Sequence, residues 1–332
     1  GTHIIGRPSP VVTGEPPVPH DDAFNALVVL GPTAAGKTRL GVQLAAAYSG
    51  ELVSADSRQV YCGLNIGAGK DLDEYAVDGR AIAYHLIDIV DLEFEFSVFD
   101  YQQRFYETFD ALQRRGVLPV IVGGTGLYLE AILQGYRMVA APKDAELRKN
   151  LDRLGDAALE QRLHSLKPRL HNLTDLTDRA RTIRAIEIAE YTRRYPPPPA
   201  PDVRPLILGV RWPRAELHRR IDERLRARLE AGLIEEVQCL LDSGIIQERL
   251  HRLGLEYRYV TEFIQGEIKS RNDLRQKLRA AIVNFAKRQE TWFRRMERRG
   301  ARLHWVNRAD LEQARAIADT CFLARKFVTE DS

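Results

Sequence analysis

The string GPTAAGKT at residues 31–38 has the residue types and spacing that bind a di- or triphosphate. It follows an apolar run and precedes a helical pattern, which is where such a loop belongs. Its glycines let the backbone turn so that N–H groups face an anion, and the helix adds its dipole. Lys37 would supply a mobile charge for the phosphates, and the Thr38 hydroxyl would bind Mg²⁺. We therefore expect Gly31, Pro32, Thr33, Ala34, Ala35, Gly36, Lys37 and Thr38 to bind a di- or triphosphate, with Mg²⁺ held at Thr38.

Alternating strand and helix patterns around this loop predict an α/β fold, with a parallel sheet flanked by helices and right-handed crossovers. Helical spacing is clearest at 36–48, where it follows the phosphate loop, and at 97–116, where Ser97 would be the N-cap and Gly116 the stop. Helical patterns also dominate after residue 212. Apolar runs predict strands at 23–31, 51–56, 84–90, 117–124 and 204–212, with a short last candidate at 304–306.

The alternation stops between residues 140 and 195, where the pattern is helical without a convincing strand. PPPPAP at 196–201 closes this segment as a stiff extended linker. We predict a P-loop-type catalytic core made of residues 23–139 and 202–310, interrupted by a helical insertion at 140–201. The five prolines within residues 1–22 predict a disordered tail, and residues 311–332 are expected to form a C-terminal helix and tail.

The chain has a small net charge, but its basic side chains are concentrated in one stretch. The net charge is only +3, but residues 287–302 hold seven basic and two acidic side chains. This suits an anionic partner that docks at one place, although a solvated helix face would look the same. The three cysteines are far apart and form no CxxC pair, which excludes a zinc ribbon or a disulfide framework. No run reaches the roughly 18 apolar residues of a membrane span, and no signal peptide is evident, so we expect a cytoplasmic protein without membrane contact.

The phosphate loop alone does not identify the reaction. A kinase or ATPase would also need an apolar strand that ends in a metal-binding Asp. Asp56 and Asp88 are the candidates, but neither follows four consecutive apolar residues. The clearest later strand, LPVIV at 118–122, ends in Gly-Gly-Thr instead.

Several long strings resemble the tRNA dimethylallyltransferase family, in order, between residues 27 and 307. They are GPTAAGKT at 31–38, SADSRQVYCGLNIG at 54–67, HLIDI at 85–89, LPVIVGGTGLYLEAILQG at 118–135 and AKRQETWFR at 286–294. The resemblance implies transfer of a dimethylallyl group from dimethylallyl diphosphate to the exocyclic amine of the tRNA adenosine 3′-adjacent to the anticodon. It also implies Mg²⁺ and a helical insertion that grips the anticodon stem-loop. We expect the enzyme to be a monomer.

The same resemblance implies roles for individual residues. Lys37, Asp56, Thr125 and Arg224 would be catalytic, with Asp56 as the base for the adenine amine. Arg224 would bind the diphosphate together with Arg220, one turn earlier on the same helix face. The alternative roles of Asp56 are to cap a helix or to support a bound metal from outside its ligands. Thr125 could be an ordinary helix N-cap, a role that can coexist with the catalytic one. The implied tRNA contacts are Asp56, Ser57, Arg58, Gln59, Thr125, Arg148, Arg181, Arg184, Lys287, Arg288, Gln289, Trp292 and Arg294, although core packing also suits Trp292.

The chain departs from the usual family motifs around the presumed RNA contacts more than around the phosphate loop. The departures are Gly67–Asp71 in place of Gly-Thr-Ala-Lys-Pro, Ala83-Tyr84 in place of Pro-His, Gly254-Leu255 in place of Gly-Tyr, and Ile282-Val283 in place of Thr-Arg. Three alternatives stay open at this point: a P-loop small-molecule kinase, a prenyltransferase acting on free adenylate, and a non-catalytic RNA-binding paralogue. Intact Lys37, Asp56 and Thr125 argue against the last, and the helical insertion argues against the second.

Overall fold

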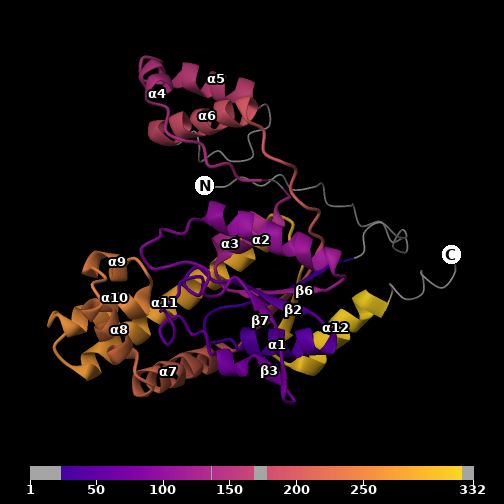
Figure 1. Cartoon of the computed structure of the whole chain (residues 1–332), viewed down its shortest axis with the longest axis vertical. Coiled ribbons are helices and arrows are strands. Elements are labelled where there is room, and N and C mark those ends of the chain that lie inside the picture. The colour runs from indigo at the N-terminus through magenta and orange to yellow at the C-terminus, as the bar shows by residue number, and fades with distance from the viewer. Residues whose placement is uncertain (1–23, 136, 168–177, 324–332) are drawn as a thin grey trace.

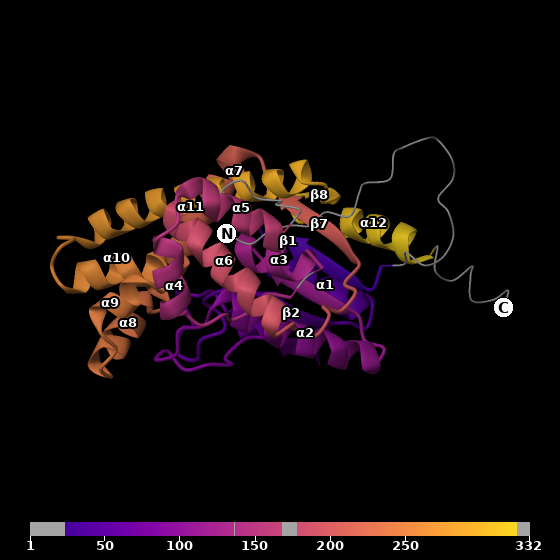
Figure 2. The ribbon, with the colours of Figure 1, turned by 90° about the horizontal axis from the view of Figure 1, so that it is seen from above.

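The computed structural model describes residues 24–135, 137–167 and 178–323, and its centre is a six-stranded parallel sheet (Figures 1 and 2). The strands lie in the order β5-β2-β6-β1-β7-β8, and every neighbouring pair is parallel. The predicted α/β fold with a parallel sheet is therefore confirmed. The strands are β1 (Ala26–Leu30), β2 (Glu51–Ala55), β5 (Tyr84–His85), β6 (Pro119–Gly123), β7 (Pro205–Arg211) and β8 (Leu303–Asn307).

Five of the predicted strands are found close to their expected positions, but the strand expected over 84–90 is wrong beyond His85. Leu86 and Asp88 have left-handed φ angles of 65° and 55°, which an extended strand does not allow. The chain there leaves the sheet, and the Ile89 N–H donates to the carbonyl of Val60 at 2.8 Å. The small hairpin of β3 (Ala76–Val77) and β4 (Arg80–Ala81) was not foreseen.

Alternate residues of the central strands face two different cores, which explains why these strands are apolar throughout. Even-numbered residues of β1 pack against α2 (Val98–Arg114) and α3 (Gly126–Leu133). Odd-numbered residues pack against α1 (Lys37–Ala47) and α12 (Leu311–Leu323). Helix α2 begins as expected at Ser97, whose hydroxyl forms a capping box with Asp100. Gly116 follows its end with a φ of 65°.

A group of helices extends the molecule to one side of the sheet, at the left of Figure 1. The long helix α11 (Arg271–Arg298) runs from this group to the sheet (Figure 2), and its buried Phe293 belongs to the α2–α3 core. The shorter helices α8 (Leu233–Asp242), α9 (Gln247–His251) and α10 (Leu255–Ile264) pack on residues 60–68 of the chain. Helix α7 (Arg214–Glu230) packs against α11.

Helices α4 (Ala145–Asp152), α5 (Asp156–Leu166) and α6 (Arg179–Arg194) stand apart from the sheet and share a small core of their own (Figure 1). One buried carboxylate on α6 also links this helix to α4. Glu187 is 2% exposed and accepts hydrogen bonds from Arg148 at 2.8 Å and Arg184 at 2.7 Å. The hydrogen bond from Arg148 is the main cause that lowers the pKa of Glu187 to about 2.

The predicted N-terminal tail at residues 1–22 and the end of the C-terminal segment, residues 324–332, lie outside the described residues. Among the helices that are described, none combines the length and apolar character needed to cross a bilayer.

Gly41 of α1 allows this helix to approach β6, and we predict that Gly41→Ala destabilises the protein. A Cβ at residue 41 would lie 2.4 Å from Cγ2 of Val122. Overpacking of this kind costs about 1–3 kcal/mol, more than the roughly 1 kcal/mol that Gly→Ala gains in an unconstrained helix. Thermal unfolding should show a lower Tm for Gly41→Ala. We also expect Gly41→Ala to lower the Tm less in a chain that already carries Val122→Ala than in the parent chain. Equal decreases in Tm in the two backgrounds would contradict the proposed contact.

Candidate functional site

One cavity of about 720 Å³ opens where the carboxyl ends of β1, β2 and β6 meet. Three segments reach it directly after these strands: the phosphate loop, residues 56–59, and residues 123–125. Helices α7, α10 and α11 close it from the other side. Crevices at the carboxyl ends of parallel strands are where open α/β sheets bind their ligands.

The phosphate loop is held in place by donors that occupy its carbonyl oxygens. Its turn is tight, with left-handed φ angles of 64° at Ala34 and 80° at Gly36. These contacts fix the loop in one conformation, in which its N–H groups without a partner in the protein can face an anion. The carbonyl partners are Lys37 Nζ on Pro32 at 3.1 Å, Arg220 Nε on Ala34 at 2.8 Å, and Trp212 Nε1 on Ala35 at 2.8 Å.

Two cations predicted to bind phosphate have unusually low pKa values. Burial, followed by repulsion from Arg224, lowers the pKa of Lys37 to about 7, although Asp56 opposes this. Burial and then Arg228 lower the pKa of Arg224 to about 10. Both side chains line the cavity, and Arg224 is 34% exposed there. An anion in the cavity would relieve this repulsion, as a phosphate site requires.

Asp56 combines two of the roles considered for it. Its Oδ1 accepts hydrogen bonds from the backbone N–H groups of Arg58 at 2.8 Å and Gln59 at 3.2 Å, which is a capping contact. No hydrogen bond to its other oxygen is found in the described part of the chain. Asp56 lines the cavity, so that oxygen is available for a ligand there.

Thr125 precedes α3 as its N-cap residue, but its hydroxyl makes no capping hydrogen bond. Its Oγ1 instead accepts the Ser57 N–H at 3.2 Å, which ties residues 56–59 to the loop after β6. Asp56 and Thr125 are therefore neighbours on the cavity wall, and Thr125 occupies the predicted N-cap position while its hydroxyl binds Ser57 instead of capping the helix.

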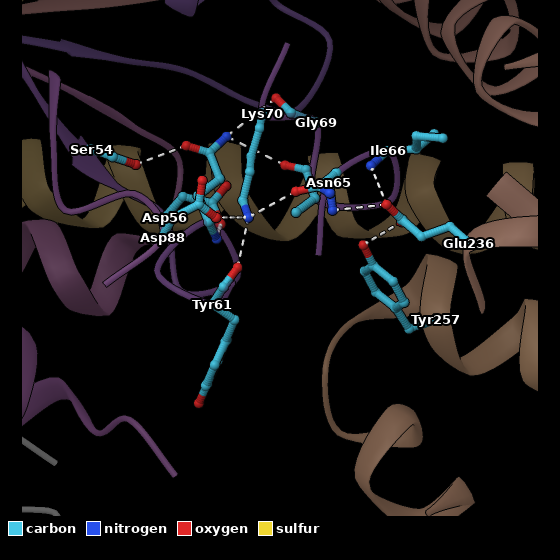
Figure 3. Close-up of polar contacts among 12 residues, drawn as sticks. Ser54, Asp56, Tyr61, Asn65, Ile66, Gly69, Lys70, Asp88, Glu236 and Tyr257 are labelled. Carbon is cyan, nitrogen blue, oxygen red and sulfur yellow. Dashed lines mark hydrogen bonds and ion pairs between the residues drawn. The ribbon is translucent and has the colours of Figure 1, made fainter. Parts of the chain in front are cut away.

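Buried polar contacts hold the wall formed by residues 61–70 (Figure 3). Lys70 is 2% exposed, donates to the carbonyl of Tyr61 at 2.6 Å and to Asn65 at 3.2 Å, and pairs with Asp88. Asp88 thus serves as the partner of a buried lysine rather than as a strand-end metal ligand. Gln59 adds hydrogen bonds to the carbonyls of Ala68 and Gly69, and accepts one from Ser54 at 2.8 Å.

Glu236 of α8 fixes the same wall from the other side (Figure 3). Its carboxylate accepts three consecutive backbone N–H groups, from Asn65 at 2.9 Å, Ile66 at 2.8 Å and Gly67 at 3.1 Å. The Tyr257 hydroxyl donates to it at 2.8 Å. Helices α8 and α10 are therefore hydrogen-bonded to the cavity wall as well as packed on it.

A second layer of charge lies behind Arg224. Arg58 forms a 2.5 Å ion pair with the buried Glu256, and Arg228 lies 3.7 Å from the same carboxylate. Burial opposes ionisation of Glu256, but Arg58 and then Arg228 outweigh it and lower its pKa. Asp71 contacts Arg224 only at 3.8 Å, which leaves Arg224 the most available arginine of this group.

The side chains expected to contact RNA divide into three groups. Arg181 on α6 and three residues on α11 are exposed. Asp56, Ser57, Arg58, Gln59, Thr125 and Gln289 line the cavity, and each has a backbone or side-chain hydrogen bond within the protein. The other three contact neighbouring parts of the protein: Trp292 lies against Gly126 and under Arg295, and the half-buried Arg148 and Arg184 bind Glu187. The exposed residues on α11 are Lys287, Arg288 and Arg294, and RNA contact by all of these residues stays a prediction.

Sequence reasoning missed several charged residues of the cavity. Arg249 and Arg252 line it near Glu95, and no motif marks the segment that carries them. Arg228 lies one turn beyond Arg224 on the same face of α7, a spacing that the sequence displays and that could have identified it. Of the departures from family motifs, Ala68, Gly69, Asp71, Leu255 and Ile282 line the cavity.

The comparisons with known proteins agree with this geometry. A family model described as IPP transferase matches residues 59–296, and one described as isopentenyl transferase matches residues 24–86. The chain is 55% identical over 282 residues to tRNA dimethylallyltransferase 1 of Geotalea uraniireducens, covering 85% of this chain and 92% of that protein. It is also 55% identical over 287 residues to tRNA dimethylallyltransferase 2 of Syntrophotalea carbinolica, covering 86% and 95%.

Solved structures are similar over nearly the whole chain. The tRNA isopentenylpyrophosphate transferase of Bacillus halodurans is 30% identical with a TM-score of 0.66, covering 91% of this chain and 99% of that one. A eukaryotic dimethylallyltransferase acting on tRNA has a TM-score of 0.69 over 93% of this chain and 81% of that one. Its identity of 21% limits that likeness to the fold.

We predict that diphosphate binding is coupled to proton uptake by Lys37. At pH 8 a lysine with a pKa of about 7 is mostly neutral, and an anion beside it raises that pKa and draws in close to one proton. Below pH 6 the lysine is already charged and the uptake disappears. Calorimetry of inorganic diphosphate binding in buffers of different ionisation enthalpy measures it. The variant Lys37→Arg, which stays charged, is the control, and uptake equal to that of the parent chain would contradict the assignment to Lys37.

Proposed function

The chain belongs to the IPP transferase family and is a tRNA prenyltransferase, and we propose on that premise that dimethylallyl diphosphate is its donor, bound by the phosphate loop. The acceptor is the exocyclic amine of the adenosine next to the anticodon on its 3′ side. One observation carries the proposal: a single cavity joins a phosphate loop, a carboxylate with an unoccupied oxygen and a neighbouring threonine. We found no support for a kinase or for a non-catalytic paralogue.

The leaving group is stabilised by fixed positive charge. As the C–O bond of the donor breaks, its electron pair passes to the diphosphate, and Lys37, Arg224 and the loop amides face that charge. Preorganised charge of this kind usually contributes more to an enzyme's rate acceleration than any other single effect. The cost of holding Lys37 and Arg224 together is already reflected in their lowered pKa values.

Mg²⁺ fits this site with few protein ligands. No group of three His, Cys, Asp or Glu side chains able to hold a metal occurs among the described residues. Thr38 lines the cavity next to Lys37, and its hydroxyl would hold the ion while diphosphate oxygens and water complete the shell, as is usual for Mg²⁺. Bound there, the ion would neutralise part of the leaving charge.

Asp56 would accept the proton as the new bond forms. The amine nitrogen attacks the donor carbon, a C–N bond forms, and the amine proton moves to the free oxygen of Asp56. Thr125 would position the reacting groups, because the hydrogen bond to Ser57 N–H orients its hydroxyl beside Asp56. The target adenine must be swung out of its stack to reach this depth.

The RNA would approach along two basic surfaces. The outer face of α11 carries Lys287, Arg288 and Arg294, and α6 carries the exposed Arg181. We propose that α4, α5 and α6 form the insertion that grips the anticodon stem-loop, supported by their separate core and their position apart from the sheet (Figure 1). We also propose that the enzyme acts as a monomer.

The test of the function is transfer of labelled dimethylallyl diphosphate to unmodified tRNA, and we predict a specific defect for Asp56→Asn. Asn keeps the oxygen that accepts the two backbone N–H groups but cannot accept the proton. Single-turnover transfer should fall by about 10²–10⁴, while tRNA affinity and Tm stay unchanged. Asp73→Asn, on an exposed nearby aspartate, is the matched control. A rate within a few-fold of the parent would assign Asp56 a structural role only, and a parent chain that labels no adenosine would overturn the function.

Arg181→Ala and Arg184→Ala should differ, although both remove an arginine from α6. Arg181 is exposed, so its loss should flatten the salt dependence of tRNA binding by at most about one unit of slope, without a change in Tm. Arg184 binds Glu187, so its loss should lower the free energy of unfolding by about 1–3 kcal/mol. Binding titrations at several salt concentrations and thermal unfolding measure the two effects. Identical behaviour of the two variants would contradict this division of roles.

A further inference from the structure

Gln289 lies on the inner side of α11, between two loops that reach the cavity from different strands. The side chain is 8% exposed. Its Oε1 accepts the N–H of Thr33, in the phosphate loop after β1, at 2.9 Å. Its Nε2 donates to the carbonyl of Gly124, in the loop after β6, at 3.0 Å. One side-chain amide therefore bridges the loop proposed to hold the donor and the loop that leads into Thr125.

The two loops are packed closely around this amide. A Cβ at residue 124 would lie 2.5 Å from Nε2 of Gln289 and 2.9 Å from the carbonyl oxygen of Gly31. Strands β1 and β6 stop pairing at Leu30 and Gly123, so the sheet itself no longer fixes the separation beyond that point. In the described part of the chain, Gln289 is the side chain whose hydrogen bonds join the phosphate loop to the loop after β6.

The helical spacing of α11 separates Gln289 from the basic face of the same helix. Gln289 shares its buried stripe with Ala286 and Phe293, three residues before and four after it. Lys287 and Arg288 point away from this stripe and are exposed. The amide thus binds two loops inside the protein. Because Gln289 also borders the cavity, the experiment must distinguish a role in positioning these loops from direct contact with a substrate.

We propose that Gln289 is a positioning residue for prenyl transfer, whose amide fixes the separation between the phosphate loop and the loop that carries Thr125. The inference rests on the proposed function, because it assigns the donor to the first loop and the acceptor side to the second. Attack requires the amine and the donor carbon to be held at about 3–3.5 Å, and a misplacement of about 1 Å costs on the order of 10²-fold in rate. The two hydrogen bonds set this separation before either substrate binds.

The test uses the full chain with Gln289→Met, which removes both hydrogen bonds at nearly constant volume, and Gln289→Glu, which keeps an acceptor for Thr33 but has no donor for Gly124. Gln276→Met is the matched control, because Gln276 is exposed on the same helix. Affinities for tRNA alone and for inorganic diphosphate alone are measured separately. The rate of single-turnover transfer is then measured with both substrates saturating, at a temperature below the Tm of every variant.

We expect both Gln289 variants to lower the saturating rate by about 10–10²-fold, and Gln276→Met to have no effect. Gln289→Met should keep each separate affinity within about threefold of the parent, whereas the carboxylate of Gln289→Glu should also weaken diphosphate binding by repulsion. A saturating rate equal to that of the parent would overturn the proposal. So would a loss of tRNA affinity whose rate defect disappears at saturating tRNA, because Gln289 would then be an RNA contact. If Gln289→Met does not fold, Gln289→Glu and the shorter Gln289→Asn decide by the same criteria. A parent chain that binds diphosphate and tRNA but transfers nothing would overturn the proposed function itself.

Discussion

Repulsion among cations around one cavity is the constraint on which the rest of this site depends. Lys37 and Arg224 line this cavity and Arg228 lies behind Arg224, and each of the three has a pKa lowered first of all by burial. A folded chain tolerates such an arrangement only if the cations are held rigidly and partly compensated. Glu256 compensates Arg58 and Arg228 from behind, while Lys37 and Arg224 remain directed at the cavity. The uncompensated charge is what a diphosphate with its metal ion would neutralise.

Rigidity around these cations comes from buried polar side chains rather than from apolar packing alone. Lys70 with Asp88, Gln59 with two loop carbonyls, and Glu236 with three consecutive amides fix the wall of residues 61–70 (Figure 3). Gln289 performs the same task between the phosphate loop and Gly124. Loops without regular structure leave backbone N–H and carbonyl groups unpaired, and a buried side chain that satisfies them also specifies one loop conformation.

In the insertion, too, a buried polar side chain holds the structure together. Its three helices bury few apolar residues, and Glu187 joins two of them by binding Arg148 and Arg184. Arginines that look like an RNA-binding surface in the sequence are thereby divided into those that hold the helices together and those, such as Arg181, that face solvent. Proximity in sequence could not separate the two kinds, because the contacts that hold Arg148 to Glu187 and Arg184 to the carbonyl of Ala141 join residues 39 and 43 positions apart.

The sequence by itself determined the phosphate loop, the parallel α/β sheet and the meeting of Lys37, Asp56 and Thr125, because each follows from a local pattern. Apolar runs mark strands, glycines mark turns, and parallel strands bring their carboxyl ends to one edge. Only the tertiary structure decided that the segment after His85 leaves the sheet, that Glu187 occupies two of the insertion's arginines, and that Gln289 joins two loops. These outcomes depend on partners that lie 39 residues away for Arg148, and 256 and 165 residues away for the two hydrogen bonds of Gln289. A local pattern carries no information about partners at such separations, which are fixed only when the chain has packed.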